Sequence, residues 1–183
     1  MRWIMSLIAA ALVVVLILIG LSDRPDRPDR PTSAEPDETQ WLIRTGMEAP
    51  GFGVVDAKGD SLRLGDFRGR YVLLDFWFTT CPPCLDELPR IRALQRKYAD
   101  RFVVVGISID RDRDRFSRFL QREEIDWPQV LDVLDNAGAV QAIYQAPYYP
   151  SYWLVNPDGE IALHGRHVLQ RLEEAGLQYD YAR

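Results

Sequence analysis

Hydrophobic and polar positions divide the chain into three segments. Residues 3–21 form an apolar run without a charged side chain, and residues 23–44 are polar and rich in proline. Beyond residue 45, short apolar runs alternate with segments in which apolar residues recur every three or four positions. That alternation is typical of buried strands and amphipathic helices. We therefore predict an N-terminal hydrophobic segment (1–22), a linker (23–44) and one α/β domain (45–183).

The predicted domain has a mixed sheet with helices on both faces. Apolar runs at 71–77 and 101–109 predict buried central strands, and turn residues predict hairpins at 52–64 and 151–164. The alternating aspartates and arginines of 110–115 predict a solvated loop and a first helical turn. Helices are predicted in four segments: after Cys81, after Asp112, over 138–145 and after Val168. The order β-β-β-α-β-α-α-β-β-α is typical of a mixed sheet covered on both faces.

The N-terminal apolar run is long enough to cross a membrane. As a helix rising about 1.5 Å per residue, residues 3–21 would span most of a hydrocarbon core of about 30 Å. Arg2 precedes the run, which favours a cytoplasmic N-terminus. The alternative is a cleaved signal peptide with Gly20 and Ser22 near the cleavage site, although such peptides usually have an apolar core of about 7–15 residues. We predict an uncleaved single-pass transmembrane anchor, and either alternative exports the rest of the chain.

The linker begins with a repeated Asp-Arg-Pro triplet over residues 23–31. Proline at every third position fixes φ and prevents a helix from continuing. We expect this segment to be an extended, solvated spacer between the membrane and the domain.

The charge and the cysteine content of the chain limit the classes of function that it can have. The chain has 183 residues and a formal net charge of −5, from 22 Lys+Arg and 27 Asp+Glu, and this balance gives no reason to expect nucleic-acid binding. It has only two cysteines, Cys81 and Cys84, within one Cys-Pro-Pro-Cys sequence. Since no other cysteine is present to build a disulfide framework, this pair is predicted to be functional rather than structural.

The position of Cys81, at a strand-to-helix transition, suits disulfide exchange. The attacking species is the thiolate, which the amides and dipole of a helix N-terminus stabilise. Cys84 follows about one turn later, so we predict Cys81 as the exposed nucleophile and Cys84 as the shielded resolving thiol. Pro82 and Pro83 fit the first turn but offer no N–H to the Cys81 sulfur. Thiolate stabilisation should therefore be modest and the pair relatively reducing.

A zinc site is the alternative use of two such cysteines. His164 and His167 add an H-x2-H pair, but they lie far downstream and their spacing is tighter than the usual three to five residues. Prolines between the cysteines also fit a zinc site poorly. We predict no metal and no cofactor.

A longer set of motifs surrounds the dithiol. The sequence Asp75-Phe76-Trp77 lies shortly before the two cysteines. With these motifs the chain resembles the thioredoxin-like superfamily. Within that superfamily it resembles the TlpA/ResA/CcmG branch of extracytoplasmic thiol–disulfide oxidoreductases. The resemblance covers about residues 46–165. It rests on ordered motifs at 46–52, 64–69, 76–89, 104–110, 149–151 and 156–159. It implies a thioredoxin-like fold with an N-terminal β-hairpin extension.

The resemblance also assigns catalytic positions. Asp75 matches the buried carboxylate beneath the dithiol, a proton acceptor for Cys84, and Glu87 matches an acidic residue near the dithiol of ResA-like proteins. A carboxyl group within an apolar strand should independently have a raised pKa, which suits proton transfer. The alternative for Glu87 is a solvated helix residue.

The resemblance further implies a substrate-binding groove. Pro150 matches the family's cis-proline, which lies against the dithiol and helps to present backbone to a substrate strand. The expected substrate-contacting residues are Pro150, Tyr149, Ser151, Trp77, Thr80, Pro82 and Pro83. Two departures affect substrate preference: Thr80 replaces an aromatic residue before the first cysteine, and residues 146–149 replace the usual Gly- and Val-containing approach to the proline. Core packing is the alternative for Trp77.

The expected function is reduction of protein disulfides outside the cytoplasm. The resemblance implies a location on the periplasmic side of the bacterial inner membrane and a membrane electron donor of the thiol-reductase type. It also implies a role in cytochrome c maturation or metal-site assembly, with apocytochrome c or metallochaperone cysteines as substrates. Two alternatives are a peroxiredoxin-like thiol peroxidase and a non-catalytic metal-delivery or binding module. Against the peroxidase, Thr79 lies two residues before Cys81, whereas peroxiredoxins place a threonine three residues before the peroxidatic cysteine.

Overall fold

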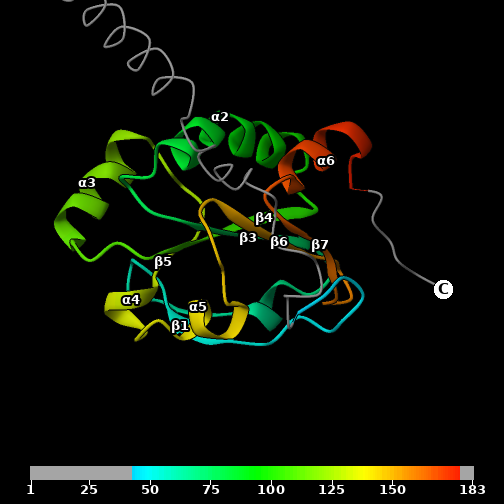
Figure 1. The fold of residues 1–183 in the computed structure, drawn as a ribbon, viewed down its shortest axis with the longest axis horizontal. Coiled ribbons are helices and arrows are strands. Elements are labelled where there is room, and N and C mark those ends of the chain that lie inside the picture. Colours follow the sequence, from blue (N-terminus) through cyan, green and yellow to red (C-terminus); the bar gives the residue numbers. More distant parts are fainter. Residues whose placement is uncertain (1–42, 178–183) are drawn as a thin grey trace, which may run out of the picture. The chain divides into compact units, whose positions relative to one another are not determined.

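A computed structural model describes residues 43–177 (Figure 1). The predicted anchor (1–22) and all but the last two residues of the predicted linker lie outside this range. Within 43–177, no helix combines the length and the apolar character needed to cross a membrane.

The core of the domain is a five-stranded mixed sheet. Its strands lie in the order β5-β4-β3-β6-β7. Strands β3, β4 and β5 are parallel, whereas β6 runs antiparallel to β3 and β7 antiparallel to β6. The strands are β3 (Tyr71–Trp77), β4 (Phe102–Ser108), β5 (Gln129–Leu131), β6 (Ser151–Val155) and β7 (Ile161–Gly165).

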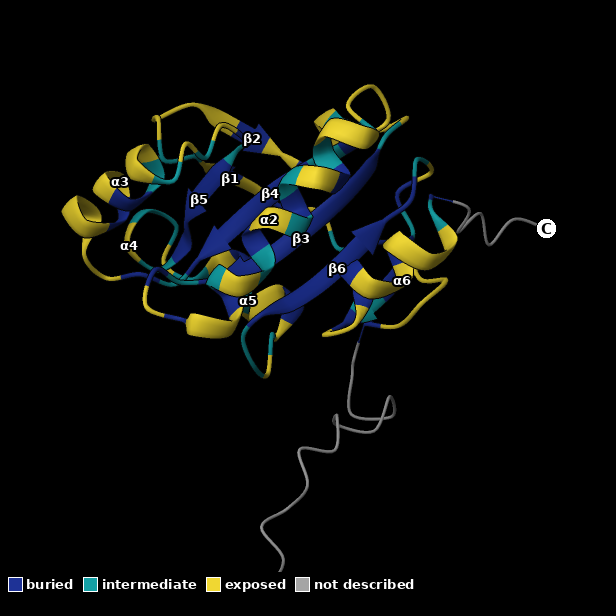
Figure 2. Ribbon diagram, turned by 90° about the horizontal axis from the view of Figure 1, so that it is seen from above, coloured by how far each residue is buried: buried dark blue, intermediate teal, exposed yellow. Residues whose placement is uncertain are grey.

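Helices cover both faces of this sheet, as predicted (Figure 1). One face carries α2 (Pro82–Lys97), α3 (Arg113–Arg122) and α6 (Val168–Ala175). The other carries the short helices and the hairpin: α4 (Asp132–Asp135), α5 (Ala139–Tyr144), the 3-10 helix η2 (Leu64–Phe67), β1 (Gly53–Val55) and β2 (Ser61–Arg63). Figure 2 shows the strands buried beneath helices whose outer surfaces are exposed.

Strand β3 is the central strand, and all seven of its residues are buried. Successive side chains of a strand point to opposite faces. Leu73 and Trp77 pack with α2, α3 and α6, whereas Leu74 and Phe76 pack with the hairpin and α5. Asp75 shares the face of Leu73 and Trp77, so the sequence pattern places a carboxyl group beneath α2.

Most predicted elements are confirmed, and three were missed. The predicted strands, both hairpins and all four helices are present within a few residues of the expected bounds. The missed elements are β5, α4 and the 3-10 helix η2, which have three, four and four residues. Periodicity over so few positions is not distinguishable from a loop. β5 is a strand because it pairs with β4, and this contact between distant segments cannot be predicted from the local sequence.

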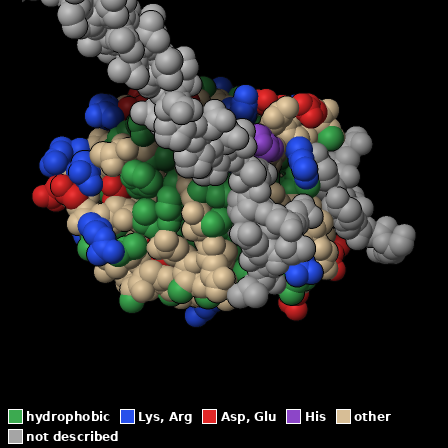
Figure 3. Space-filling view, in the orientation of Figure 1, with side chains coloured by type: hydrophobic (Ala, Val, Ile, Leu, Met, Phe, Trp, Pro, Cys, Tyr) green, Lys and Arg blue, Asp and Glu red, His purple; other side chains and the backbone are tan. Residues whose placement is uncertain are grey.

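Charged side chains on the described surface are mixed in sign. On the face shown in Figure 3, basic and acidic side chains lie mainly toward the edges, around hydrophobic side chains. Several arginines pair with carboxylates, among them Arg68 with Glu48 at 3.3 Å and Arg90 with Glu173 at 2.9 Å. The part of this face that the grey atoms leave visible shows no continuous basic area.

One glycine permits a close approach inside the sheet. The Gln129 side chain lies over Gly106 of β4, where its Oε1 accepts a hydrogen bond from Trp77 Nε1 at 3.1 Å. A Cβ atom on Gly106 would lie 2.3 Å from Gln129 Oε1, closer than atoms can pack.

We therefore expect Gly106→Ala to lower the free energy of unfolding by about 1–3 kcal/mol, because it displaces the Gln129 amide from Trp77. Gly51→Ala is the matched control: its added Cβ meets no atom within 4 Å, and a change within about 0.5 kcal/mol is expected. Urea unfolding followed by tryptophan fluorescence measures both. Equal stabilities of the two variants would contradict this account of the sheet.

Candidate active site

The two cysteines form a disulfide at the start of α2. The chain leaves β3 at Trp77, and Cys81 is the residue that caps the N-terminus of α2. Its Sγ is bonded to that of Cys84 at 2.00 Å, with the two Cα atoms 5.3 Å apart. Pro82 and Pro83 occupy the first two helical positions and are exposed. The predicted placement of the pair at a strand-to-helix transition is confirmed.

One amide contacts the Cys81 sulfur. The backbone N–H of Cys84 donates to Cys81 Sγ at 3.3 Å. The two preceding residues are prolines and have no N–H to offer, so the Cys84 amide is the first in the helix that can do so. This hydrogen bond favours a negative charge on Cys81 Sγ when the disulfide opens.

Both cysteines are buried in the disulfide form, which corrects the expectation of an exposed Cys81. Each has 3% of its surface exposed. The half-buried rings of Phe78 and Tyr149 pack against the hydrophobic cluster that contains both cysteines, and these two rings meet edge to face at 5.5 Å. The S–S bond also turns the Cys81 sulfur toward Cys84. Apolar packing that sequence periodicity did not predict therefore shields the nucleophile in this state.

The peptide bond between Tyr149 and Pro150 is cis, as the resemblance implied. It lies directly before β6, whose first residue pairs with Phe76 near the end of β3. The Tyr149 hydroxyl accepts a hydrogen bond from Gln141 Nε2 at 2.5 Å, and burial raises the pKa of this tyrosine. The β3–β6 pairing thus brings the proline loop to the end of the sheet from which the dithiol loop departs.

Two of the expected substrate-contacting side chains lie in the core. Trp77 is 2% exposed and packs between Phe116 and Phe119, with ring centroids 5.9 and 5.5 Å away. Ser151 is fully buried on β6, opposite Phe76. Both side chains are buried in the disulfide form, which favours core packing for Trp77, and contact of either residue with a substrate stays a prediction. Both positions belong to strands whose two faces are covered, which explains their burial.

Asp75 is a buried carboxyl group on the α2 face of the sheet. It is 4% exposed, and it pairs in register with Gly106 on β4 and Tyr152 on β6. Burial, and second the negative charge of Glu87, raise the pKa of Asp75 to about 8. Both the apolar strand and the raised pKa agree with the sequence prediction.

Glu87 lies on α2, one turn beyond Cys84, and is only partly exposed. Arg90 Nη1 forms an ion pair with its carboxylate at 2.8 Å, while Arg90 Nε pairs with Glu173 of α6 at 2.9 Å. Glu87 is therefore tied into a charge network between α2 and α6 and acts electrostatically on Asp75. The alternative of a freely solvated helix residue does not describe it.

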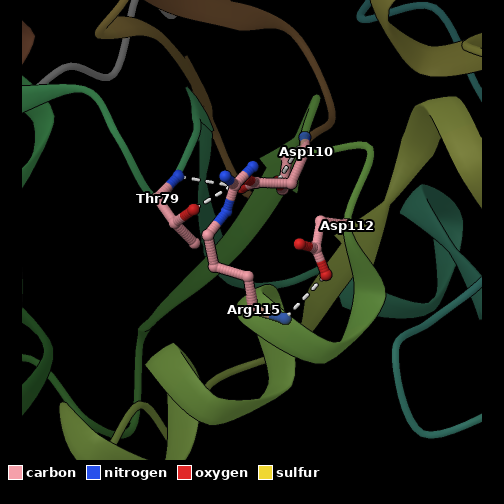
Figure 4. Close-up of polar contacts among 5 residues, drawn as sticks. Thr79, Asp110, Asp112 and Arg115 are labelled. Carbon is pink, nitrogen blue, oxygen red and sulfur yellow. Dashed lines mark hydrogen bonds and ion pairs between the residues drawn. The ribbon is translucent and has the colours of Figure 1, made fainter.

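A polar anchor beneath the dithiol loop was missed by the sequence analysis. The Asp110 carboxylate accepts hydrogen bonds from the Thr79 amide at 2.8 Å and from the Thr79 hydroxyl at 2.6 Å (Figure 4). Ser108 Oγ donates to it at 2.8 Å, and Arg115 lies 3.4 Å away. Asp110 is 4% exposed, so the prediction of a solvated loop from residue 110 was wrong at this position. A carboxylate directly after a buried strand was the available signal.

The predicted cap of α3 is confirmed in the same region. Asp112 Oδ1 accepts a hydrogen bond from the Arg115 amide at 2.9 Å (Figure 4). This backbone hydrogen bond is the main cause of a lowered pKa at Asp112. The loop after β4 therefore contains two aspartates with different surroundings, one buried beneath the dithiol loop and one exposed at a helix end.

The structure places the two histidines and the two cysteines in different elements of the fold. His164 lies on β7 and His167 precedes α6, whereas both cysteines are at the start of α2 and bonded to each other. Among residues 43–177, no group of three or more His, Cys, Asp and Glu side chains is arranged to hold a metal ion.

Comparisons with known proteins place this geometry in a family. The model of the AhpC/TSA family matches residues 45–164. Thiol-disulfide oxidoreductase ResA of Bacillus thuringiensis subsp. konkukian is 30% identical over 135 residues, which cover 72% of this chain and 76% of that protein. Thioredoxin-like protein YneN of Bacillus subtilis is 30% identical over 122 residues, or 65% of this chain and 69% of YneN.

Solved structures agree with these sequence relatives. The thioredoxin domain of a thiol-disulfide oxidoreductase from Bacteroides vulgatus is 32% identical with a TM-score of 0.61, covering 72% of this chain and 97% of that domain. A thiol:disulfide interchange protein from a Bacteroides species is 30% identical with a TM-score of 0.63, covering 76% and 94%. Together with the Cys81–Cys84 disulfide, these matches show that the chain belongs to the AhpC/TSA family of thioredoxin-like proteins and is a thiol–disulfide oxidoreductase.

Proposed function

We propose that this protein is a membrane-anchored reductase of protein disulfides on the outer side of the bacterial cytoplasmic membrane. The observation that carries the proposal is the Cys81–Cys84 pair at the start of α2, with the Cys84 amide directed at Cys81 Sγ. This arrangement favours a thiolate at Cys81 and keeps a second thiol within bonding distance.

The reaction follows from the two sulfurs. The Cys81 thiolate attacks one sulfur of a substrate disulfide, forming a mixed disulfide and releasing the first substrate thiolate. The Cys84 thiol then loses its proton and attacks Cys81 Sγ, which closes the Cys81–Cys84 disulfide and releases the second substrate thiolate. Two electrons pass from the dithiol to the substrate disulfide.

Asp75 is the proposed proton acceptor for Cys84. It lies on the face of β3 beneath α2. Its raised pKa, about 8, is suited to proton transfer near neutral pH. Glu87 contributes by its negative charge, which favours the protonated form of Asp75 and therefore strengthens it as a base.

A reductase outside the cytoplasm needs an electron supply, because its surroundings are oxidising. We infer a membrane partner of the thiol-reductase type, positioned by an anchor formed from residues 3–21. The naming of relatives as thiol-disulfide oxidoreductases supports protein disulfides as substrates, and those we propose are apocytochrome c or metallochaperone cysteines. The proposed groove residues are Thr80, Pro82 and Pro83, which are exposed, Tyr149, which is half-buried, and Pro150, whose side chain is buried in the disulfide form.

The peroxidase and metal-delivery alternatives gain no specific support. The Thr79 hydroxyl, the group nearest in sequence to the threonine of peroxiredoxins, donates to Asp110 instead of being available at the dithiol. The peroxidase alternative gives an outcome that the following experiment distinguishes from disulfide reduction.

We expect the full chain in detergent micelles to catalyse insulin reduction by dithiothreitol, and Cys81→Ser and Cys84→Ser each to abolish it. Cys84→Ser should retain insulin as a mixed disulfide on Cys81, because the resolving thiol is missing, whereas Cys81→Ser should trap none. Trapping is read on non-reducing gels. Trapping by Cys81→Ser alone would reverse the assigned roles, and peroxide consumption without insulin reduction would favour the peroxidase.

Burial of Asp75 should make stability depend on pH. The folded chain keeps the Asp75 proton up to a pKa of about 8, whereas the unfolded chain loses it near 3.8. The stabilisation associated with this proton is complete below about pH 4 and is lost as pH rises toward 8, by at most about 1.4 kcal/mol per pH unit. We expect the oxidised wild type to lose stability relative to Asp75→Asn over this window in urea titrations. Parallel curves for the two proteins would show that Asp75 is not a buried, protonated group.

A further inference from the structure

A tyrosine lies directly opposite the buried carboxyl group. Tyr152, the second residue after Pro150, pairs in antiparallel register with Asp75. Side chains of such a pair point to the same face of the sheet, with Cβ atoms about 4.5–5.5 Å apart. Tyr152 is 1% exposed and belongs to the hydrophobic cluster that contains both cysteines. The pair therefore lies between the sheet and α2, beneath the dithiol.

The hydroxyl of this tyrosine is buried without a hydrogen-bond partner among the described residues. An unpaired buried hydroxyl is unfavourable, and a phenylalanine would fill the same space without that cost. Packing alone therefore does not account for a tyrosine here. A carboxylate is a stronger acceptor than a neutral carboxyl group, so a hydroxyl that gains its hydrogen bond when the site ionises does account for it.

Two carboxyl groups and one guanidinium group act on Tyr152, and Asp75 is the one that its strand register places opposite. Tyr152 interacts electrostatically with Asp75, Glu87 and Arg90. Arg90 forms ion pairs with Glu87 and with Glu173 of α6, so its charge is already shared between two carboxylates. Burial foremost, and then the charges of Asp75 and Glu87, raise the pKa of Tyr152. The phenol consequently keeps its proton and remains a donor when Asp75 ionises.

We propose that Tyr152 is a positioning residue for the proton acceptor, and that its hydroxyl donates a hydrogen bond to the Asp75 carboxylate when that carboxylate is charged. The inference rests on the proposed function and extends it. In the resolving step, the proton passes from Cys84 Sγ to Asp75, while the Cys84 electron pair forms the bond to Cys81 Sγ and the substrate thiolate leaves. Tyr152 does not exchange a proton. It lowers the cost of holding a negative charge at Asp75 in a buried site.

The single-turnover oxidation of the reduced full chain by dithiobis(nitrobenzoate) separates the two chemical steps. Attack by Cys81 releases a first coloured thiolate, and closure of the disulfide by Cys84 releases a second. The pH dependence of the second phase therefore reports the proton acceptor. Tyr152→Phe should move the midpoint of this phase upward by about one pH unit, so that its rate near pH 7 falls about tenfold but recovers at high pH.

The matched control is Tyr144→Phe. Tyr144 is equally buried, but it lies on the opposite face of the sheet, where its hydroxyl donates to the Pro50 carbonyl at 2.9 Å. Its removal costs a hydrogen bond and should lower stability without moving the midpoint of the second phase. At a pH well below the Asp75 pKa of about 8, Tyr152→Phe should leave the stability of the oxidised protein unchanged or higher, because the Tyr152 hydroxyl has no partner while Asp75 is neutral.

A second readout is independent of turnover. The infrared carboxyl band of oxidised protein, assigned by its loss in Asp75→Asn, should titrate at higher pH in Tyr152→Phe than in the wild type. An unchanged midpoint in both measurements would overturn the role of Tyr152 while leaving Asp75 as the acceptor. If Asp75→Asn itself left the second phase and its pH profile unaltered, the proposed proton transfer would be wrong, and the role of Tyr152 would fall with it.

Discussion

The pairing of β3 with β4 on one side and β6 on the other is the constraint on which the site depends. β3 leads into the loop that carries Cys81, β4 ends shortly before the aspartate that anchors this loop, and β6 begins at the cis-proline. The register between β3 and β6 then places the titratable groups of the site, because it sets Asp75 opposite Tyr152 and beneath α2. A slip of β6 by one residue against β3 would turn Tyr152 to the other face of the sheet, away from Asp75. Three segments that are distant in sequence thus meet around one disulfide.

The site combines a stabilised sulfur with a destabilised carboxylate. The amide that contacts Cys81 Sγ favours charge at the start of α2, whereas burial and Glu87 disfavour charge at Asp75. Opposed environments of this kind separate the roles of neighbouring titratable groups: one is ready to attack and the other to accept a proton. The ion pairs of Arg90 hold the first turns of α2 against α6, which keeps Glu87 at the edge of this arrangement.

Sequence periodicity predicted the central strands, the dithiol helix and both hairpins because each has a strong local pattern. The cis-proline and Asp75 came from ordered motifs and, for Asp75, from a carboxyl group in an apolar run. The remaining features depend on contacts between distant segments. Cys81 is buried in a hydrophobic cluster drawn from several helices and strands, the anchor joins Thr79 to Asp110, and the Trp77 ring packs against Phe116 and Phe119 of α3. No local pattern encodes such contacts, and only the folded register reveals the Asp75–Tyr152 pair.

The reduction potential of the Cys81–Cys84 pair tests the central claim most directly. The full chain would be equilibrated with glutathione or dithiothreitol buffers of known potential, and its free thiols trapped and counted. The account predicts a potential near or below that of thioredoxin, about −270 mV, as a reductant supplied by a membrane partner requires. A value near about −120 mV would make the protein a disulfide donor and contradict the assignment as a reductase.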